Sequence, residues 1–108
     1  MKRLVPEYSD KESRRILTQL FTARVEQVNV TEAPHGAILG NHFHKSTKEY
    51  FYVIRGSMKY NNKEMLKKGD LFMVEPHERH TLKVLSDKAT FITFLSEPYN
   101  VDSPDLHK

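Results

Sequence analysis

Short runs of β-branched, aromatic and other apolar residues recur along the chain from residue 49 onward, and turn-forming residues separate them. The runs cover residues 49–55, 57–60, 63–66, 71–75, 80–85 and 89–95. An earlier run, residues 24–30, also has strand character and ends near the Pro34-His35-Gly36 break. Strands that repeat every roughly 8 to 12 residues with turns between them are typical of antiparallel sandwiches and barrels. The pattern therefore predicts an all-β, barrel-like fold.

The first 23 residues leave their secondary structure open. Ser9 and Glu12 have the spacing of a helix capping box ahead of Ile16, Leu17 and Leu20. The same apolar residues also fit a short strand through residues 16–21. We therefore expect one short N-terminal helix or a strand in this segment.

Length and composition exclude several classes of protein. The 108 residues predict a single domain spanning 1–108, with its core at residues 24–95. The scattered basic residues and a net charge of only +3 argue against nucleic acid as a partner. No apolar run approaches the roughly 18 to 20 residues that cross a bilayer, and the start lacks a signal peptide's apolar centre, so we expect a cytoplasmic protein without a membrane partner. The absence of cysteine excludes disulfides, thiolate nucleophiles and iron–sulfur clusters.

Histidines are the residues that most suggest a function, because six occur in this short chain and most lie in two segments. His42 and His44 are two apart, so on a strand they face the same side. Glu49 opens the next run, where a hairpin would return its carboxylate toward them. His80 shares a strand face with Leu82, and a histidine directed into an apolar barrel needs a partner for its ring nitrogens. We interpret these three histidines and Glu49 as candidate ligands of one metal ion.

The spacing Gly36-x5-His42-x-His44-x4-Glu49-x6-Gly56 reproduces the first signature of the cupins. The chain thus resembles a small single-domain cupin. The resemblance implies a double-stranded β-helix, or jelly-roll barrel, of antiparallel strands. It also implies one divalent metal ion bound by His42, His44, Glu49 and His80, and commonly a homodimer.

A second cupin signature is present in a modified form. Gly69, Pro76 and His80 are similar to the family's glycine, proline and histidine. The usual glycine between the proline and the histidine is missing, and Val84 stands where the family has an asparagine. The resemblance covers residues 24–95, and the turn before His80 is the part that it defines least.

The ligand set leaves the metal and the reaction open. Three neutral imidazoles and one carboxylate suit Fe, Mn, Zn, Ni or Co. Such an ion could support epimerase or isomerase chemistry, or dioxygenase chemistry with iron and O₂. Residues 20–45 and 98–107 resemble stretches of sugar-nucleotide epimerases and of cupin domains in capsular-polysaccharide enzymes. This favours a metal-dependent isomerase that acts on an oxygen-rich small molecule, with a non-catalytic small-molecule-binding cupin as the remaining alternative.

Further candidates surround the expected metal site. His77 could act as an acid or base because it precedes His80 by three residues, although it could also be a solvated loop histidine. Arg55 and Arg79 could bind a phosphate or carboxylate, or form surface ion pairs. We take His77 and Arg79 as the catalytic candidates, and His35 and Glu78 as further residues near the site.

An apolar face is expected on the side of residues 49–55 that points away from the metal. Tyr50, Tyr52 and Ile54 alternate with Glu49 and the residues on its side. A strand that is apolar on both faces is buried on both. We therefore expect a second sheet or a partner subunit, in a homodimer, to cover this face.

Overall fold

The computed structural model describes residues 1–108 and consists of strands and connecting loops. The strands are β1 (Lys2–Leu4), β2 (Tyr8–Lys11), β3 (Ile16–Gln19), β4 (Gln27–Pro34), β5 (Ile38–His42), β6 (Glu49–Arg55), β7 (Ser57–Tyr60), β8 (Glu64–Lys67), β9 (Leu71–Val74), β10 (His80–Val84) and β11 (Lys88–Leu95). The strand bounds agree with the runs expected from residue 49 onward. No helix that could cross a membrane is present.

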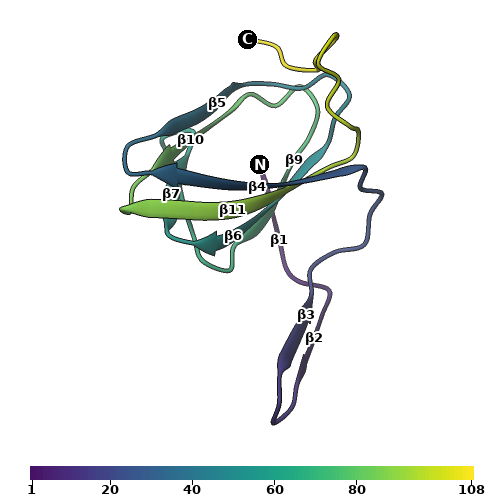
Figure 1. The fold of residues 1–108 in the computed structure, drawn as a ribbon, viewed down its shortest axis with the longest axis vertical. Helices are drawn as coiled ribbons and strands as arrows, with labels where there is room; N and C mark the ends of the chain where they lie inside the picture. The colour runs from purple at the N-terminus through teal and green to yellow at the C-terminus, as the bar shows by residue number, and fades with distance from the viewer.

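Two antiparallel sheets face each other and form a barrel (Figure 1). One sheet has the order β1-β9-β6-β11-β4, and the other has the order β5-β10-β7-β8. All strand pairs are antiparallel. The predicted all-β jelly-roll barrel is therefore confirmed.

The N-terminal segment does not form the short helix that was one of the two expectations. β2 and β3 pair with each other as a separate hairpin that projects from the barrel (Figure 1). The backbone N–H of Glu12 donates to the carbonyl of Arg15 across the hairpin turn. The Glu12 side chain bonds Arg14 instead of capping a helix. Cross-strand backbone pairing therefore replaces the hydrogen bonds that a helix would have made, and the strand interpretation is the correct one.

The hydrophobic core lies between the two sheets. Its twelve buried residues are Ala33, Phe51, Val53, Met58, Tyr60, Leu66, Phe72, Val74, Leu82, Val84, Ala89 and Phe91. Phe51 and Phe72 stack with ring centroids 4.7 Å apart. The Phe51 ring also lies 6.2 Å from the ring of His80, so the core continues directly into the histidine cluster.

The outer face of β6 is covered by the chain's own N-terminal segment at one end only. The ring of Phe21 stacks on Tyr50 at 4.2 Å and meets Phe94 edge-on at 5.1 Å. Farther along the strand, Ile54 remains 39% exposed. The expectation that a second sheet or a partner must cover this whole face was therefore wrong at Tyr50, because residues before the barrel supply the cover.

Two glycines of the cupin signatures have similar backbones but different surroundings. Gly56 has φ +86° and Gly69 has φ +90°, so both adopt a conformation that side chains disfavour. A Cβ on Gly56 would lie 2.2 Å from the carbonyl oxygen of Lys88. A Cβ on Gly69 would meet nothing within 4 Å. Gly56 is thus required both by its φ angle and by the close approach of β11.

We expect Gly56→Ala to lower the free energy of unfolding by about 3 kcal/mol or more, because a steric clash adds to the backbone strain. Gly69→Ala is the matched control and should cost only about 1 to 2 kcal/mol, from strain alone. Urea denaturation followed by circular dichroism measures both. Equal losses for the two variants would contradict the assignment of a steric requirement to Gly56.

Candidate metal centre

The four predicted ligands come together at one end of the barrel. The candidate ligand atoms of His42, His44, Glu49 and His80 all lie within 4.8 Å of one another. His42 ends β5 and His80 begins β10, and the two residues oppose each other in the antiparallel register. Glu49 begins β6 in the other sheet. Both sheets therefore contribute to the cluster, which closes this end of the core.

A β-bulge turns His42 toward His80. The register shifts here, so that His80 pairs with His42 while Thr81 pairs with Gly40 and Asn41 is left as the extra residue. Gly40 and Asn41 have φ angles of +83° and +59°. A Cβ on Gly40 would lie 2.9 Å from the carbonyl oxygen of His80. Sequence reasoning missed this bulge, although the Gly-Asn dipeptide was a signal for it.

Backbone carbonyls orient two of the imidazoles. Nδ1 of His44 lies 2.6 Å from the carbonyl oxygen of Asp105, and Nδ1 of His80 lies 3.2 Å from that of Glu78. A carbonyl only accepts, so each Nδ1 carries a proton and each Nε2 points toward Glu49. Histidines that bind metals commonly donate their second ring N–H to a carbonyl in this way.

The polar atoms at the centre of the cluster fit a bound cation. Nε2 of His44 and Oε1 of Glu49 are buried and in direct contact with each other, and neither has any further hydrogen-bond partner. Nε2 of His80 lies 3.5 Å from the same oxygen. Lone pairs of neutral imidazoles and of a carboxylate repel each other when they converge without water, unless a proton or a cation lies between them. Three imidazole nitrogens and one carboxylate oxygen are a donor set that suits a divalent transition metal.

The protonation behaviour of the cluster reflects the buried carboxylate. Burial by itself raises the pKa of Glu49, but contacts with His44 and His80 outweigh it and hold this pKa at about 2. Burial likewise disfavours the charged form of His44, but the adjacent Glu49 raises the pKa of His44 above its ordinary value. Burial, together with the neighbouring His80 and His44, lowers the pKa of His42 to about 4. The metal-free cluster therefore holds its proton beside Glu49, while His42 stays neutral.

The side chains of His77 and Arg79 lie around the ring of Phe43. The Arg79 guanidinium lies 5.8 Å from the centroid of this ring, and the imidazole of His77 lies 6.4 Å from it. The ring of His107, from the C-terminal segment, lies 5.4 Å from it. His77 and Arg79 are both exposed, and Phe43 stands between two of the ligands in the chain. His107 was not singled out by sequence reasoning, which carried no signal that the C-terminal segment returns here.

His35 and Arg55, which were expected near the site, lie elsewhere. Nδ1 of His35 bonds the carbonyl of Leu85, just beyond the end of β10 that is opposite His80. Arg55 ends β6, the strand that Glu49 begins. Both expectations were wrong: His35 lies in a turn near the end of β10 that is opposite His80, and Arg55 lies at the end of β6 that is opposite Glu49.

Glu78 anchors the loop that precedes His80. Its carboxylate accepts a hydrogen bond from the hydroxyl of Tyr60 and contacts the N-terminal amino group. Its backbone carbonyl orients His80, as described above. His77 adopts φ +72° in the same loop. The loop is thus tied to the barrel by Glu78 without the glycine that the second cupin signature contains.

A cavity of about 680 Å³ lies between the C-terminal segment and the loop that follows His42. It is lined by His44, Ser46, Thr47, Leu95, Glu97, Pro98, Tyr99, Asn100, Val101, Ser103, Asp105 and Leu106. The lining offers hydroxyl, amide and carboxylate groups and contains neither lysine nor arginine. Its volume falls within the range of small-molecule sites, and its chemistry suits a ligand rich in hydroxyl groups.

The fold and the cluster together define a small jelly-roll barrel with a metal-type ligand set at one end. The family model of the cupin domain matches residues 29–95, so the chain belongs to the cupin family. No curated protein matches the chain significantly.

Solved structures share this fold at low sequence identity. The capsular polysaccharide assembling protein CapF from Staphylococcus aureus is 22% identical, with a TM-score of 0.66, over 93% of this chain and 33% of CapF. The epimerase RmlC from Mycobacterium tuberculosis is 19% identical, with a TM-score of 0.74, over 93% of this chain and 64% of RmlC. RmlC from Legionella pneumophila, solved in complex with dTDP-4-keto-L-rhamnose, is 17% identical, with a TM-score of 0.73, over 91% and 67% of the two chains. This chain thus spans about a third of CapF and about two thirds of these epimerases.

We predict that in metal-free protein His44 titrates above pH 6.5 and that His42 remains neutral down to about pH 4. In Glu49→Gln the pKa of His44 should fall, because burial then acts without the opposing carboxylate. Histidine-selective ¹H–¹⁵N NMR over this pH range measures each group. Glu75→Gln, which alters an exposed carboxylate, should leave both titrations unchanged. A His44 that titrates identically in wild type and Glu49→Gln would contradict the pairing.

Proposed function

We propose that the chain binds one divalent metal ion through His42, His44, Glu49 and His80 and acts as an epimerase or isomerase on a small oxygen-rich molecule such as a sugar nucleotide. The observation that carries the metal site is the buried contact between Nε2 of His44 and Oε1 of Glu49, neither of which has any further hydrogen-bond partner. A bound divalent ion would polarise a carbonyl oxygen of the substrate and make the neighbouring C–H more acidic.

The surroundings of the cluster support the choice of substrate class. The cavity lined by His44 and the C-terminal segment offers the polar side chains of Tyr99, Asn100 and Ser103, which suit sugar hydroxyls. Arg79 supplies an exposed cation that suits a phosphate group. Solved structures with the same fold include sugar-nucleotide epimerases, which supports the proposal of this class of substrate.

His77 and Arg79 take separate parts in this proposal. Arg79 would bind a negatively charged group of the substrate through its guanidinium. His77 presents an exposed imidazole beside Phe43 and would exchange a proton with the substrate.

The function is tested first by metal content and then by proton exchange. Protein purified without a histidine tag or chelator should contain about one divalent ion per chain. With a 4-keto-6-deoxy sugar nucleotide in D₂O, it should introduce deuterium at a carbon adjacent to the keto group, as followed by ¹H NMR. His42→Ala/His44→Ala should lose the metal and slow the exchange at least about 100-fold, yet stay folded, because both histidines lie outside the core cluster.

His35→Ala is the matched control, because it removes an imidazole from the opposite end of the barrel. It should retain both metal and exchange. Stoichiometric metal in the double variant would show that the ligand assignment is wrong. Iron with substrate-dependent O₂ consumption and no deuterium exchange would point to a cupin dioxygenase. Absence of metal from both proteins would point to a metal-free, non-catalytic binding module.

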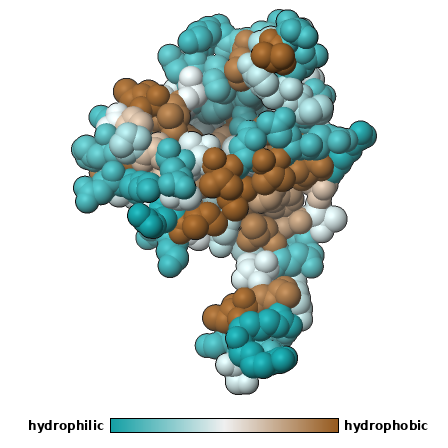
Figure 2. Space-filling model, viewed as in Figure 1, coloured by the Kyte–Doolittle hydropathy of each residue, from teal (hydrophilic) through white to brown (hydrophobic).

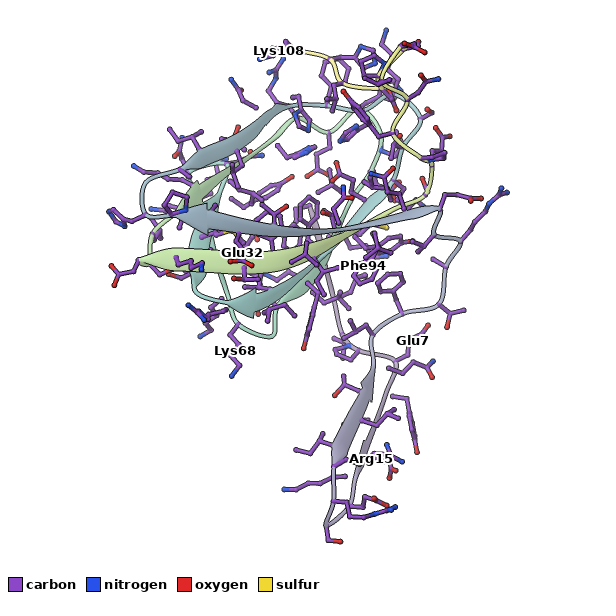
Figure 3. All side chains as sticks on the ribbon, viewed as in Figure 1. Glu7, Arg15, Glu32, Lys68, Phe94 and Lys108 are labelled. Carbon is purple, nitrogen blue, oxygen red and sulfur yellow. The ribbon has the colours of Figure 1, made fainter.

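We also propose that two copies of the chain associate through the N-terminal hairpin and the outer face of β4. An isolated two-stranded hairpin is marginally stable, yet β2–β3 projects from the barrel, with Arg15 near its tip well away from the two sheets (Figure 3). Ile16 on the hairpin and Val30 on β4 are each 65% exposed. Figure 2 shows apolar surface both on the hairpin and on the face over β4 and β11.

A groove beside this face has the composition of a docking surface. It has a volume of about 530 Å³ and is lined only by apolar residues, namely Leu20, Phe21, Ala23, Val25, Val28 and Phe94. Exposed apolar patches of this kind commonly mark contacts with another protein. In a two-fold dimer each chain would place its apolar hairpin in the groove of the other chain. Both hairpins and both grooves would then be buried.

Light scattering after gel filtration should therefore give twice the 12.7 kDa mass of one chain. Ile16→Glu and Val30→Glu should each shift the protein toward monomer, because each places a charge in the proposed contact. Met65→Glu, which changes an exposed apolar residue on β8, is the control and should leave the dimer intact. A monomer mass independent of concentration in the wild type would contradict the proposal.

A further inference from the structure

Three consecutive backbone N–H groups in the loop that carries His44 donate to one distant carboxylate. We refer to residues 43–48, between β5 and β6, as the ligand loop. The N–H of Lys45 donates to Oδ1 of Asp105 at 2.8 Å, and those of Ser46 and Thr47 donate to Oδ2 at 2.9 Å each. The hydroxyls of Ser46 and Thr47 donate to Oδ2 as well, at 3.1 and 2.9 Å. Successive N–H groups that converge in this way form a nest for an anion, and here the Asp105 carboxylate fills it.

The same residue also orients a candidate metal ligand. The backbone carbonyl of Asp105 accepts the hydrogen bond from Nδ1 of His44 at 2.6 Å. Two residues later, His107 exchanges both backbone hydrogen bonds with Phe43, at 2.9 and 3.0 Å. The C-terminal segment thus adds a short bridge to the ligand loop, with Asp105 directly behind the imidazole of His44.

His44 needs such support more than the other three ligands do. His42, Glu49 and His80 are terminal residues of strands, so sheet hydrogen bonds hold their backbones. His44 lies in the ligand loop, outside every strand. Its N–H and carbonyl have no ladder partner, although the carbonyl accepts a bond from the N–H of His77. A ligand on a loop holds its position only as well as the contacts around that loop.

We propose that Asp105 is a positioning residue: its carboxylate holds the ligand loop and its carbonyl holds the His44 ring, so that metal affinity depends on the C-terminal segment. The inference deepens the metal binding proposed above and rests on it. Without the carboxylate, three backbone N–H groups lose their acceptor and the loop exchanges them for water. The imidazole of His44 is then no longer held in one orientation. Only the other three candidate ligands remain in place to bind the metal.

Asp105→Asn tests this with almost no change of shape. An amide keeps one oxygen and replaces the other with an NH₂ group, which only donates. In one orientation the NH₂ faces the donors of Ser46 and Thr47, and in the other it faces the N–H of Lys45. Either way, donors oppose each other. Asp102→Asn is the matched control, because Asp102 is exposed on the same segment and its carboxylate makes no hydrogen bond or ion pair.

Two measurements are made on each variant. Isothermal titration with Co²⁺ gives metal affinity, and NMR of metal-free protein gives amide hydrogen exchange at residues 45–47. For Asp105→Asn we expect roughly a 10- to 100-fold loss of affinity, as for other residues that orient a metal ligand. Exchange at the three amides should accelerate at least about tenfold. Asp102→Asn should match the wild type in both. Wild-type affinity in Asp105→Asn would overturn the proposal.

The exchange measurement keeps this inference separate from the proposed function. If wild-type protein binds no Co²⁺, the metal-binding function fails, and slow exchange that is lost in Asp105→Asn still supports the positioning role of Asp105. Unchanged exchange would overturn that role too. If Asp105→Asn does not fold, Thr47→Val removes one buried hydroxyl donor to the carboxylate at nearly constant volume. It should weaken Co²⁺ binding roughly two- to fivefold, and unchanged affinity would overturn the proposal.

Discussion

The burial of the Glu49 carboxylate against the imidazoles of His44 and His80 is the constraint on which this end of the molecule depends. A carboxylate removed from water requires compensation by protons, cations or hydrogen-bond donors. The two sheets converge here, one contributing Glu49 and the other His42 and His80. The apolar core begins directly below the cluster at Phe51 and supplies none of these groups. The same arrangement favours a proton shared by Glu49 and His44. It also presents ligand atoms of the kind that a divalent ion would bind.

The remaining geometry directs side chains toward that point. Gly40 and Asn41 form a bulge that turns His42 inward, which requires positive φ angles and a residue without a Cβ beside His80. Glu78 ties down the loop before His80, and Asp105 holds the loop that carries His44. Asp105 at the same time satisfies three backbone N–H groups that would otherwise be unpaired. The position of His44 thus depends on contacts to its loop, whereas strand ends hold the backbones of His42, Glu49 and His80.

Much of the site could be predicted from the chain, and the parts that could not share a cause. The spacing of His42, His44 and Glu49 is local, and a period of two on a strand places such residues on one face. The spacing of His80, Leu82 and Val84 predicted a strand with all three side chains on one inward face. The structure confirms that all three are buried. His35 and Arg55 were misplaced because sequence distance from a ligand does not say at which end of a strand a residue lies. His77 and Arg79 both lie around the ring of Phe43, and their role toward a substrate stays a prediction.

The sequence by itself determined the all-β class, the approximate strand bounds from residue 49 onward and the grouping of the three histidines with Glu49, because these follow from short-range alternation, turn residues and spacing. Only the tertiary structure decided that residues 8–19 form a projecting hairpin instead of a helix, since the local signals for the two were balanced and cross-strand pairing resolved them. It also decided that Asp105 meets residues 45–47, some sixty positions away. No local pattern encodes such a contact, because it forms only when the folded barrel brings the C-terminal segment across its mouth.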